Sequence, residues 1–155
     1  MTGSIVFRNA RREDLAAIIG LHEADLLGGH GDVWSDENRP RYEAAFEALL
    51  TDDREHIFIA ELDGVVIGSM IATLLVELTG RAKPHVLFRS IQIAESHRSQ
   101  GIGALMMEHA EADARHWGAS VAELTSSTKR ANAHRFYARL GYIQSHLGFK
   151  KRLSF

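Results

Sequence analysis

Residues 91–104 read IQIAESHRSQGIGA, a strand-like segment that passes through a glycine turn into a helix. Gly101 and Gly103 lie on this turn, where the missing side chains let backbone N–H groups approach a ligand closely. The N-terminus of the following helix adds partial positive charge, which favours an anion. Arg98, three residues before Gly101, adds a group that can form charge-assisted hydrogen bonds. The segment therefore predicts an anion site, suited to a phosphate, between a strand and a helix.

The glycine pair alone does not identify the ligand, because Gly-x-Gly is also typical of a tight strand-to-helix turn that binds nothing. The segment lacks the Gly-Lys-Ser/Thr ending of the loop that binds nucleoside triphosphates. It also lacks the third glycine and the early position in the chain of a dinucleotide-binding fold. Nucleoside triphosphates and NAD are therefore poor fits.

Hydrophobic periodicity predicts the elements on both sides of this segment. Before it we expect a strand at 5–8, helices at 13–27 and 41–50, a hairpin of strands at 56–62 and 65–78, and a strand at 86–94. After it we expect a helix at 101–117, a strand at 120–124, a helix at 131–140 and a last strand at 142–149. The glycine-rich residues 27–32 predict a mobile loop. The predicted fold is α/β in the order βααβββαβαβ, with a mixed, mostly antiparallel sheet.

Composition limits the class of protein. The 155 residues, 45% apolar and 25% charged, predict one globular domain over residues 1–155. The longest apolar run, 65–75, is too short to span a membrane. The first residues lack the basic and then apolar pattern of a secretion signal, so we expect a cytoplasmic location and no membrane partner.

Charge and metal-binding residue types exclude further classes. The chain has no cysteine, which excludes disulfides and a cysteine nucleophile. A net charge of −2 argues against a nucleic-acid partner. None of the nine histidines has the spacing of a zinc helix, so we expect no metal. Basic residues do gather between 129 and 152, which suits a small polyanionic ligand or simply a solvated surface.

Two stretches resemble one known family. Residues 98–104, RSQGIGA, resemble the acetyl-CoA pyrophosphate loop of GNAT acetyltransferases, whose pattern is Arg/Gln-x-x-Gly-x-Gly/Ala. Residues 131–142, ANAHRFYARLGY, resemble the family's late helix and the strand after it. The stretches lie at the family's spacing, and the predicted element order matches over nearly the whole chain. The resemblance implies a sheet that opens between the strands at 86–94 and 120–125, with CoA in the opening. It also implies an N-acetyltransferase that moves an acetyl group from acetyl-CoA to a primary amine, with a small molecule favoured.

The resemblance also implies which residues bind the cofactor. Ile91 and Ile93 would lie on the strand whose backbone pairs with the pantetheine arm. Asn132 matches a position that often contacts CoA near its pantetheine, and a helix N-cap is an equally good interpretation of this residue. The residues expected to wrap the pyrophosphate are Arg98, Ser99, Gln100, Gly101, Ile102, Gly103 and Ala104.

Two positions bear on catalysis. Tyr137 matches the tyrosine that in many members protonates the departing thiolate, although Phe136 and Tyr137 also fit as core aromatics. Many members carry a glutamate four residues before the position of Ile93 that helps to deprotonate the amine; here that position is Arg89, which stays protonated. Glu123, His85 or a chain of waters are the alternatives for the base. Arg89 would contact an acidic group of the substrate or pair with a neighbouring carboxylate.

The acceptor and the assembly stay open. We expect the acceptor to approach over the early helices and the glycine loop, where His22, Glu23, Asp25, His30 and Asp32 favour a cation. A protein acetyltransferase acting on a chain N-terminus or a lysine is the main alternative. The missing glutamate keeps a second alternative, a CoA-binding module without catalysis. Whether the chain forms a homodimer is open.

Overall fold

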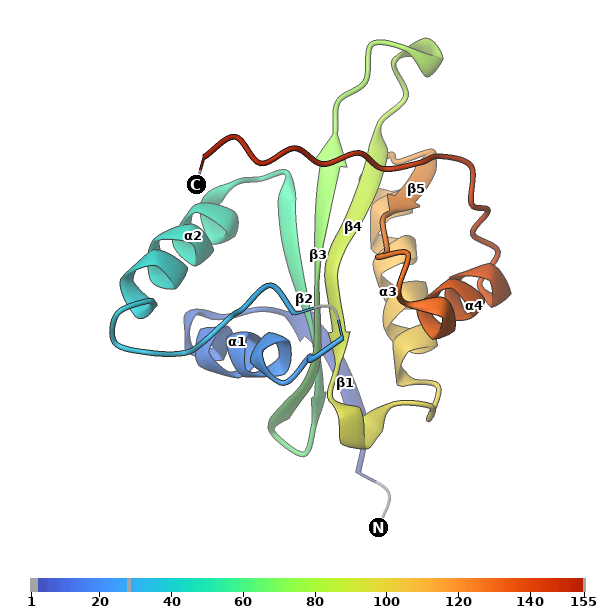
Figure 1. Cartoon of the computed structure of the whole chain (residues 1–155). Helices are drawn as coiled ribbons and strands as arrows, with labels where there is room; N and C mark the ends of the chain where they lie inside the picture. The colour runs from blue at the N-terminus through green and yellow to red at the C-terminus, as the bar shows by residue number, and fades with distance from the viewer. Residues whose placement is uncertain (1–2, 28, 155) are drawn as a thin grey trace.

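The computed structural model describes residues 3–27 and 29–154, which form a five-stranded sheet with helices on both faces (Figure 1). The strands, in sheet order, are β1 (Ile5–Asn9), β2 (Glu55–Leu62), β3 (Val65–Leu75), β4 (His85–Ile93) and β5 (Val121–Leu124). The helices are α1 (Leu15–Glu23), α2 (Arg39–Thr51), α3 (Ile102–His116) and α4 (Ala131–Arg139). Along the chain these elements follow the predicted order as far as α4.

The sheet is antiparallel from β1 to β4 and parallel between β4 and β5. The parallel pair follows from the crossover through α3. Its pairing ends at Phe88 and Leu124, although β4 continues to Ile93. The two strands therefore separate in the second half of β4, at the predicted opening.

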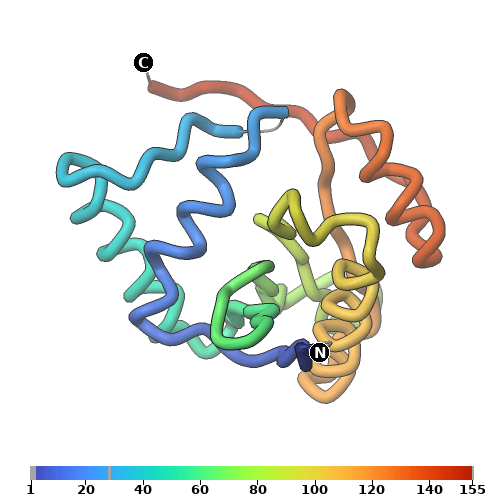
Figure 2. The backbone as a smooth tube through the Cα atoms, turned by 90° about the horizontal axis from the view of Figure 1, so that it is seen from below, coloured from blue at the N-terminus to red at the C-terminus, as the bar shows by residue number. Residues whose placement is uncertain are grey.

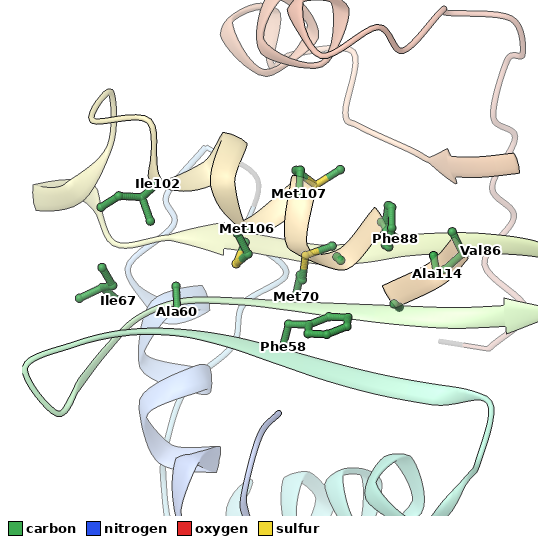
Figure 3. Packing of buried hydrophobic residues seen from close by; sticks show 12 residues of the cluster. Phe58, Ala60, Ile67, Met70, Val86, Phe88, Ile102, Met106, Met107 and Ala114 are labelled. Carbon is green, nitrogen blue, oxygen red and sulfur yellow. The ribbon is translucent and has the colours of Figure 1, made fainter. Parts of the chain in front are cut away.

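Side chains alternate between the two faces of the sheet and build two cores. One face packs against α3 through a cluster that includes Phe58, Met70, Phe88 and Met106 (Figure 3). The other face packs against α1 and α2. Figure 2 shows these two helices on one side of the sheet and α3 and α4 on the other. The buried members of the second cluster are Leu15, Ile18, Ile19, Phe46, Ile57 and Ile59.

The start of α1 is fixed by a buried ion pair. Arg8 on β1 donates from Nη1 to Asp14 Oδ2 over 2.7 Å and from Nη2 to Asp14 Oδ1 over 2.8 Å. The Asp14 side chain is only 5% exposed, and its Oδ2 also accepts the Arg11 N–H at 2.6 Å. The hydrogen bonds from Arg8 hold the pKa of Asp14 below its ordinary value. The pair therefore joins the first turn of the helix to the edge strand.

We expect Asp14→Asn to lower the free energy of unfolding at pH 7 by about 2 kcal/mol, because Arg8 loses its charged acceptor at Asp14 and keeps Glu61 as its remaining carboxylate partner. Since the folded-state pKa of Asp14 is lowered, the carboxylate stabilises the fold above its unfolded pKa of about 3.9 and loses this effect as the pH falls through the folded value. Urea unfolding of both proteins at pH 7 and pH 3 measures the difference, which should shrink at the lower pH. An equal midpoint at pH 7 would contradict the prediction.

Two sequence expectations need correction. No strand forms at 142–149, where the chain crosses the molecule without a ladder (Figure 1). Gln144, Ser145 and His146 interrupt the apolar alternation, and Gly148 weakens it further. The first helix ends at Glu23 rather than at 27. Position 28 of the expected glycine loop lies outside the described residues. Among the helices that the structure describes, none is both long and apolar enough to cross a membrane.

Candidate active site

The turn between β4 and α3 has the backbone that the glycine pattern predicts. Gly101 adopts a left-handed conformation with φ of +80°, which only glycine takes without strain. A Cβ at Gly101 would meet open space, whereas a Cβ at Gly103 would lie 3.2 Å from Cζ of Phe136 on α4. Gly101 therefore serves the turn, and Gly103 serves the close approach of α4 to α3.

This turn presents backbone N–H groups without intrahelical acceptors. The first backbone hydrogen bond of α3 runs from the Leu105 N–H to the Gly101 carbonyl over 3.1 Å. The N–H groups of Ile102, Gly103 and Ala104 precede it, so no carbonyl of the helix can accept from them. Such a cluster of donors at a helix N-terminus fits a phosphate or pyrophosphate.

Two polar side chains of the predicted pyrophosphate loop donate hydrogen bonds to nearby backbone carbonyls and so stabilise the loop. Arg98 donates from Nε to the Ile93 carbonyl over 3.0 Å, and Gln100 donates from Nε2 to the Ser96 carbonyl over 3.0 Å. Ser99, between them, has a φ of +59°. The Arg98 guanidinium is thereby held at the end of β4, and its terminal nitrogens can still donate to an anion.

The strand that leads into the turn contains a bulge. Ser90 has a φ of +53°, and the register between β3 and β4 shifts at Ser69 and Ile71. Beyond the bulge, Ile91 and Ile93 pack against the same core cluster as Phe88. Their side chains therefore face the protein. Beyond Phe88 none of the described strands pairs with the edge of β4 that faces the opening, so its backbone groups can bind an extended ligand.

The helix α4 places Asn132 and Tyr137 on the far side of the opening. Asn132 is not the N-cap, because the helix begins at Ala131 and Arg130 is the N-cap; the Asn132 side chain instead accepts a hydrogen bond from Arg135. The Tyr137 ring packs edge-on against the rings of Phe136 and Tyr142, with distances between ring centroids of 5.1 Å and 6.1 Å. Burial raises the pKa of Tyr137, so the phenol keeps its proton at neutral pH. Both interpretations of Tyr137, core aromatic and proton donor, fit this position.

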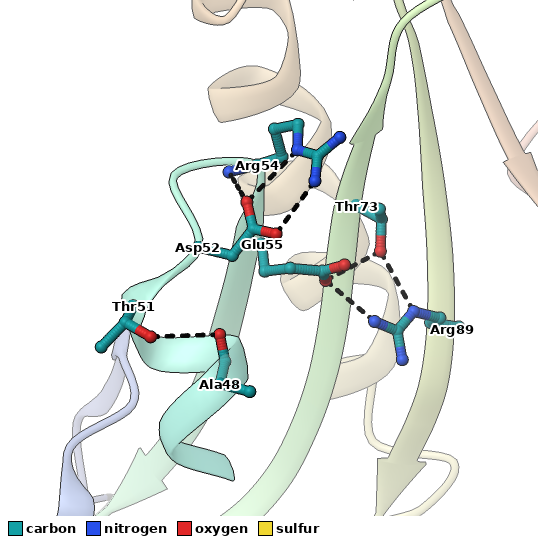
Figure 4. A network of polar contacts seen from close by, with 7 residues as sticks. All are labelled: Ala48, Thr51, Asp52, Arg54, Glu55, Thr73 and Arg89. Carbon is teal, nitrogen blue, oxygen red and sulfur yellow. Dashed lines mark hydrogen bonds and ion pairs between the residues drawn. The ribbon is translucent and has the colours of Figure 1, made fainter. Parts of the chain in front are cut away.

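Arg89 pairs with a neighbouring carboxylate (Figure 4). It donates from Nη2 to Glu55 Oε2 over 2.8 Å and from Nε to Thr73 Oγ1 over 3.0 Å. The Thr73 hydroxyl in turn donates to Glu55 Oε2 over 2.9 Å. The three residues come from adjacent strands on the face that packs against α1 and α2, so Arg89 has the second of its two expected roles.

The candidate base Glu123 is bound to the other candidate, His85. The Glu123 Oε1 and His85 Nδ1 lie 2.8 Å apart. In the parallel ladder Glu123 is opposite Leu87, so its carboxylate leans back toward the start of β4 and away from the opening.

In the part of the chain that the structure describes, no three acidic or histidine side chains gather as metal ligands would.

An ion pair across the opening could not be expected from the sequence. Asp25, just after α1, is bound by Arg130, which precedes α4. The two residues are 105 positions apart in the sequence, and the side chains of Asp25 and Arg130 are 9% and 27% exposed, respectively. Arg130 appeared only within the basic C-terminal part of the sequence, where no local pattern distinguished it. The pair connects the loop after α1 to the helix that carries Tyr137.

Known proteins resemble this chain over nearly its whole length. The family described as "Acetyltransferase (GNAT) family" matches residues 15–142. An aminoalkylphosphonate N-acetyltransferase from Salmonella typhimurium is 36% identical over 94% of this chain and 90% of its own length. A crystal structure described as a transcriptional regulator from Bacillus halodurans superposes with a TM-score of 0.92 at 25% identity, covering 97% and 100% of the two chains. An aminoglycoside N-acetyltransferase in complex with CoA shares the fold, with a TM-score of 0.79 at 18% identity and coverage of 99% and 98%.

Proposed function

The chain belongs to the acetyltransferase (GNAT) family, whose members are acetyl-CoA-dependent acyltransferases, and on this premise we propose that it acetylates the primary amine of a small molecule. The observation that carries the proposal is the row of N–H groups at the start of α3, next to the open edge of β4. A helix terminus with free donors binds a pyrophosphate, and an open strand edge binds the amide-bearing pantetheine arm. Acetyl-CoA carries both groups, with the pyrophosphate joined to the pantetheine arm along one molecule.

In the proposed complex the N–H groups of Ile102, Gly103 and Ala104 donate to the pyrophosphate, and Arg98 adds its charge. The backbone around Ile91 and Ile93 pairs with the pantetheine arm. Asn132 and Tyr137 approach the sulfur end from α4. These assignments follow from where each group lies: the partly buried Ile91 and Ile93 side chains pack against the core, and the backbone edge of β4 faces the opening.

Acetyl-CoA supplies the acetyl group as a thioester. The acceptor amine forms the new C–N bond at the thioester carbonyl, while a backbone N–H of β4 polarises the carbonyl oxygen. As the C–S bond breaks, the Tyr137 hydroxyl gives its proton to the sulfur. The raised pKa of Tyr137 keeps that proton in place until negative charge develops next to it.

We further propose an acceptor that carries an acidic group beside its amine, as an aminoalkylphosphonate does. The proposal draws on the 36% identity with the Salmonella typhimurium enzyme over most of both chains. Release of free CoA, followed with a thiol reagent, tests it across aminoalkylphosphonates, amino acids, polyamines, aminoglycosides and peptides. We expect the highest kcat/KM with an aminoalkylphosphonate. A preference for peptides would favour a protein acetyltransferase, and acetyl-CoA binding without CoA release from any acceptor would favour a non-catalytic module.

We expect Glu123→Gln to change kcat by no more than about 3-fold, far below the roughly 100-fold to 10,000-fold effect of a general base. The reason is that the carboxylate is bound to His85 and leans away from the opening. Steady-state kinetics with the best acceptor of the panel measure it. Loss of activity with intact acetyl-CoA affinity would instead make Glu123 the base.

A further inference from the structure

The helix α1 spans the face of the sheet from the edge strand to the opening. Its first turn is fixed to β1 by the Arg8–Asp14 pair, and the loop after its last turn is fixed to the start of α4 by the Asp25–Arg130 pair. Between these two anchors the helix packs against β3 and β4. The last turn of α1 therefore lies at the β4 side of the sheet, facing α4.

His22 lies in that last turn, on the side of the helix that faces the sheet. The buried residues of α1 are Leu15, Ile18 and Ile19, and His22 is the next position at the same spacing of three and four. The residue is half-buried, unlike the exposed Glu23 beside it. A ring nitrogen of His22 can thus face the opening from the end of an otherwise apolar stripe.

The surroundings of His22 keep its imidazole neutral. Burial lowers its pKa, and the charges of His30 and Arg130 act in the same direction, against the opposing effect of Asp32 and Asp25. These four groups come from the loop after α1 and from the start of α4, the two segments that close on the last turn. Within the described residues His22 forms no side-chain hydrogen bond, so neither ring nitrogen is committed to a partner there.

We propose that His22 is the base that accepts the proton of the acceptor amine. As the C–N bond forms, a proton moves from the amine nitrogen to the lone pair of a His22 ring nitrogen. On the other side of the opening Tyr137 gives its proton to the departing sulfur. One proton thus leaves the nitrogen and one reaches the sulfur, and solvent restores His22 and Tyr137 to their starting states.

The other candidates are less suitable for this step. Arg89 occupies the position of the usual glutamate, stays protonated and is bound to Glu55. Glu123 and His85 bind each other. His22 is a neutral imidazole on the acceptor side, and an imidazole that is unprotonated at neutral pH is available to accept a proton.

The inference rests on the proposed function, and His22→Gln tests it. Glutamine keeps a polar side chain of similar reach but cannot take up a proton at neutral pH. We expect kcat with the best acceptor to fall by about 100-fold, the low end of the usual range for general acid–base catalysis, with the acetyl-CoA Kd unchanged within about 2-fold. His116→Gln is the matched control, because His116 is exposed at the end of α3 that lies away from the Gly101 turn, and it should keep kcat within about 2-fold of the wild type.

A second variant separates proton transfer from a structural role. His22→Ala leaves space for a small base, so added imidazole should raise its kcat in proportion to concentration and should leave Glu123→Ala unaffected. A His22→Gln protein with wild-type kcat, or a His22→Ala protein that is folded, inactive and indifferent to imidazole, would overturn the proposal. A wild-type protein that acetylates no amine would overturn the proposed function instead.

Discussion

Gly101→Asp is expected to remove acetyl-CoA binding. The substitution places a carboxylate next to the N–H groups that begin α3, where the pyrophosphate is proposed to bind. Two like charges 4 Å apart repel by about 4 kcal/mol at the effective dielectric of a protein surface, which corresponds to about a 1,000-fold weaker Kd. The left-handed backbone of Gly101 adds a cost of about 1–2 kcal/mol for any side chain. Titration calorimetry of the folded variant with acetyl-CoA measures the loss.

Two alanine variants separate the charge from the backbone. Gly101→Ala carries the strain without the charge, and its Cβ meets open space, so we expect a much smaller loss of affinity than with aspartate. Gly103→Ala places a Cβ 3.2 Å from the Phe136 ring and tests the packing of α4 against α3 instead. Wild-type affinity in Gly101→Asp would place the pyrophosphate elsewhere.

The local parts of this site could be predicted from the sequence, because each depends on neighbours in the chain. The glycine turn after β4 requires a left-handed residue and a helix start, and residues 99–104 show both. The opening beside β4 was implied by the resemblance of residues 98–104 and 131–142 to the family, and the crossover helix explains why β4 and β5 are parallel. Both features need no knowledge of distant side chains.

The charged pairs could not be predicted, because they join residues far apart in the chain. Arg89 had two expected roles, and only the register of β2, β3 and β4 places Glu55 and Thr73 beside it. The Asp25–Arg130 pair likewise depends on how the loop after α1 meets α4. The prediction of a last strand was wrong for a different, local reason: polar residues at 144–146 and Gly148 interrupt the apolar alternation of 142–149.

These pairs change how the acceptor side is understood. The acidic residues at 23–32 were expected to favour a cation, yet Asp25 is bound to Arg130 and Asp32 accepts a hydrogen bond from Tyr42 over 3.0 Å. The charge of Asp25 is therefore compensated by a cation, whereas the neutral Tyr42 hydroxyl leaves the charge of Asp32 in place, so this face favours a cation less strongly than its acidic residues suggest.

Tyr137→Phe is expected to lower kcat while leaving the fold and the acetyl-CoA Kd nearly unchanged. The substitution removes one oxygen and keeps the ring that packs against Phe136 and Tyr142. General acid catalysis is worth about 100-fold to 10,000-fold, and we expect the smaller end here for two reasons. A thiolate leaves readily without help, and burial raises the pKa of Tyr137, which makes the phenol a weaker acid.

The pH dependence separates proton donation by Tyr137 from packing. A donor with a raised pKa stays protonated throughout the neutral range, so kcat of the wild type should not fall through loss of this proton below about pH 10. Tyr142→Phe is the matched control: it removes a hydroxyl from the adjacent ring, whose partner is Glu111 on α3 at 2.8 Å, and should lower stability without lowering kcat. If Tyr137→Phe turned over at the wild-type rate while remaining folded, Tyr137 would be a packing residue, and solvent would protonate the thiolate.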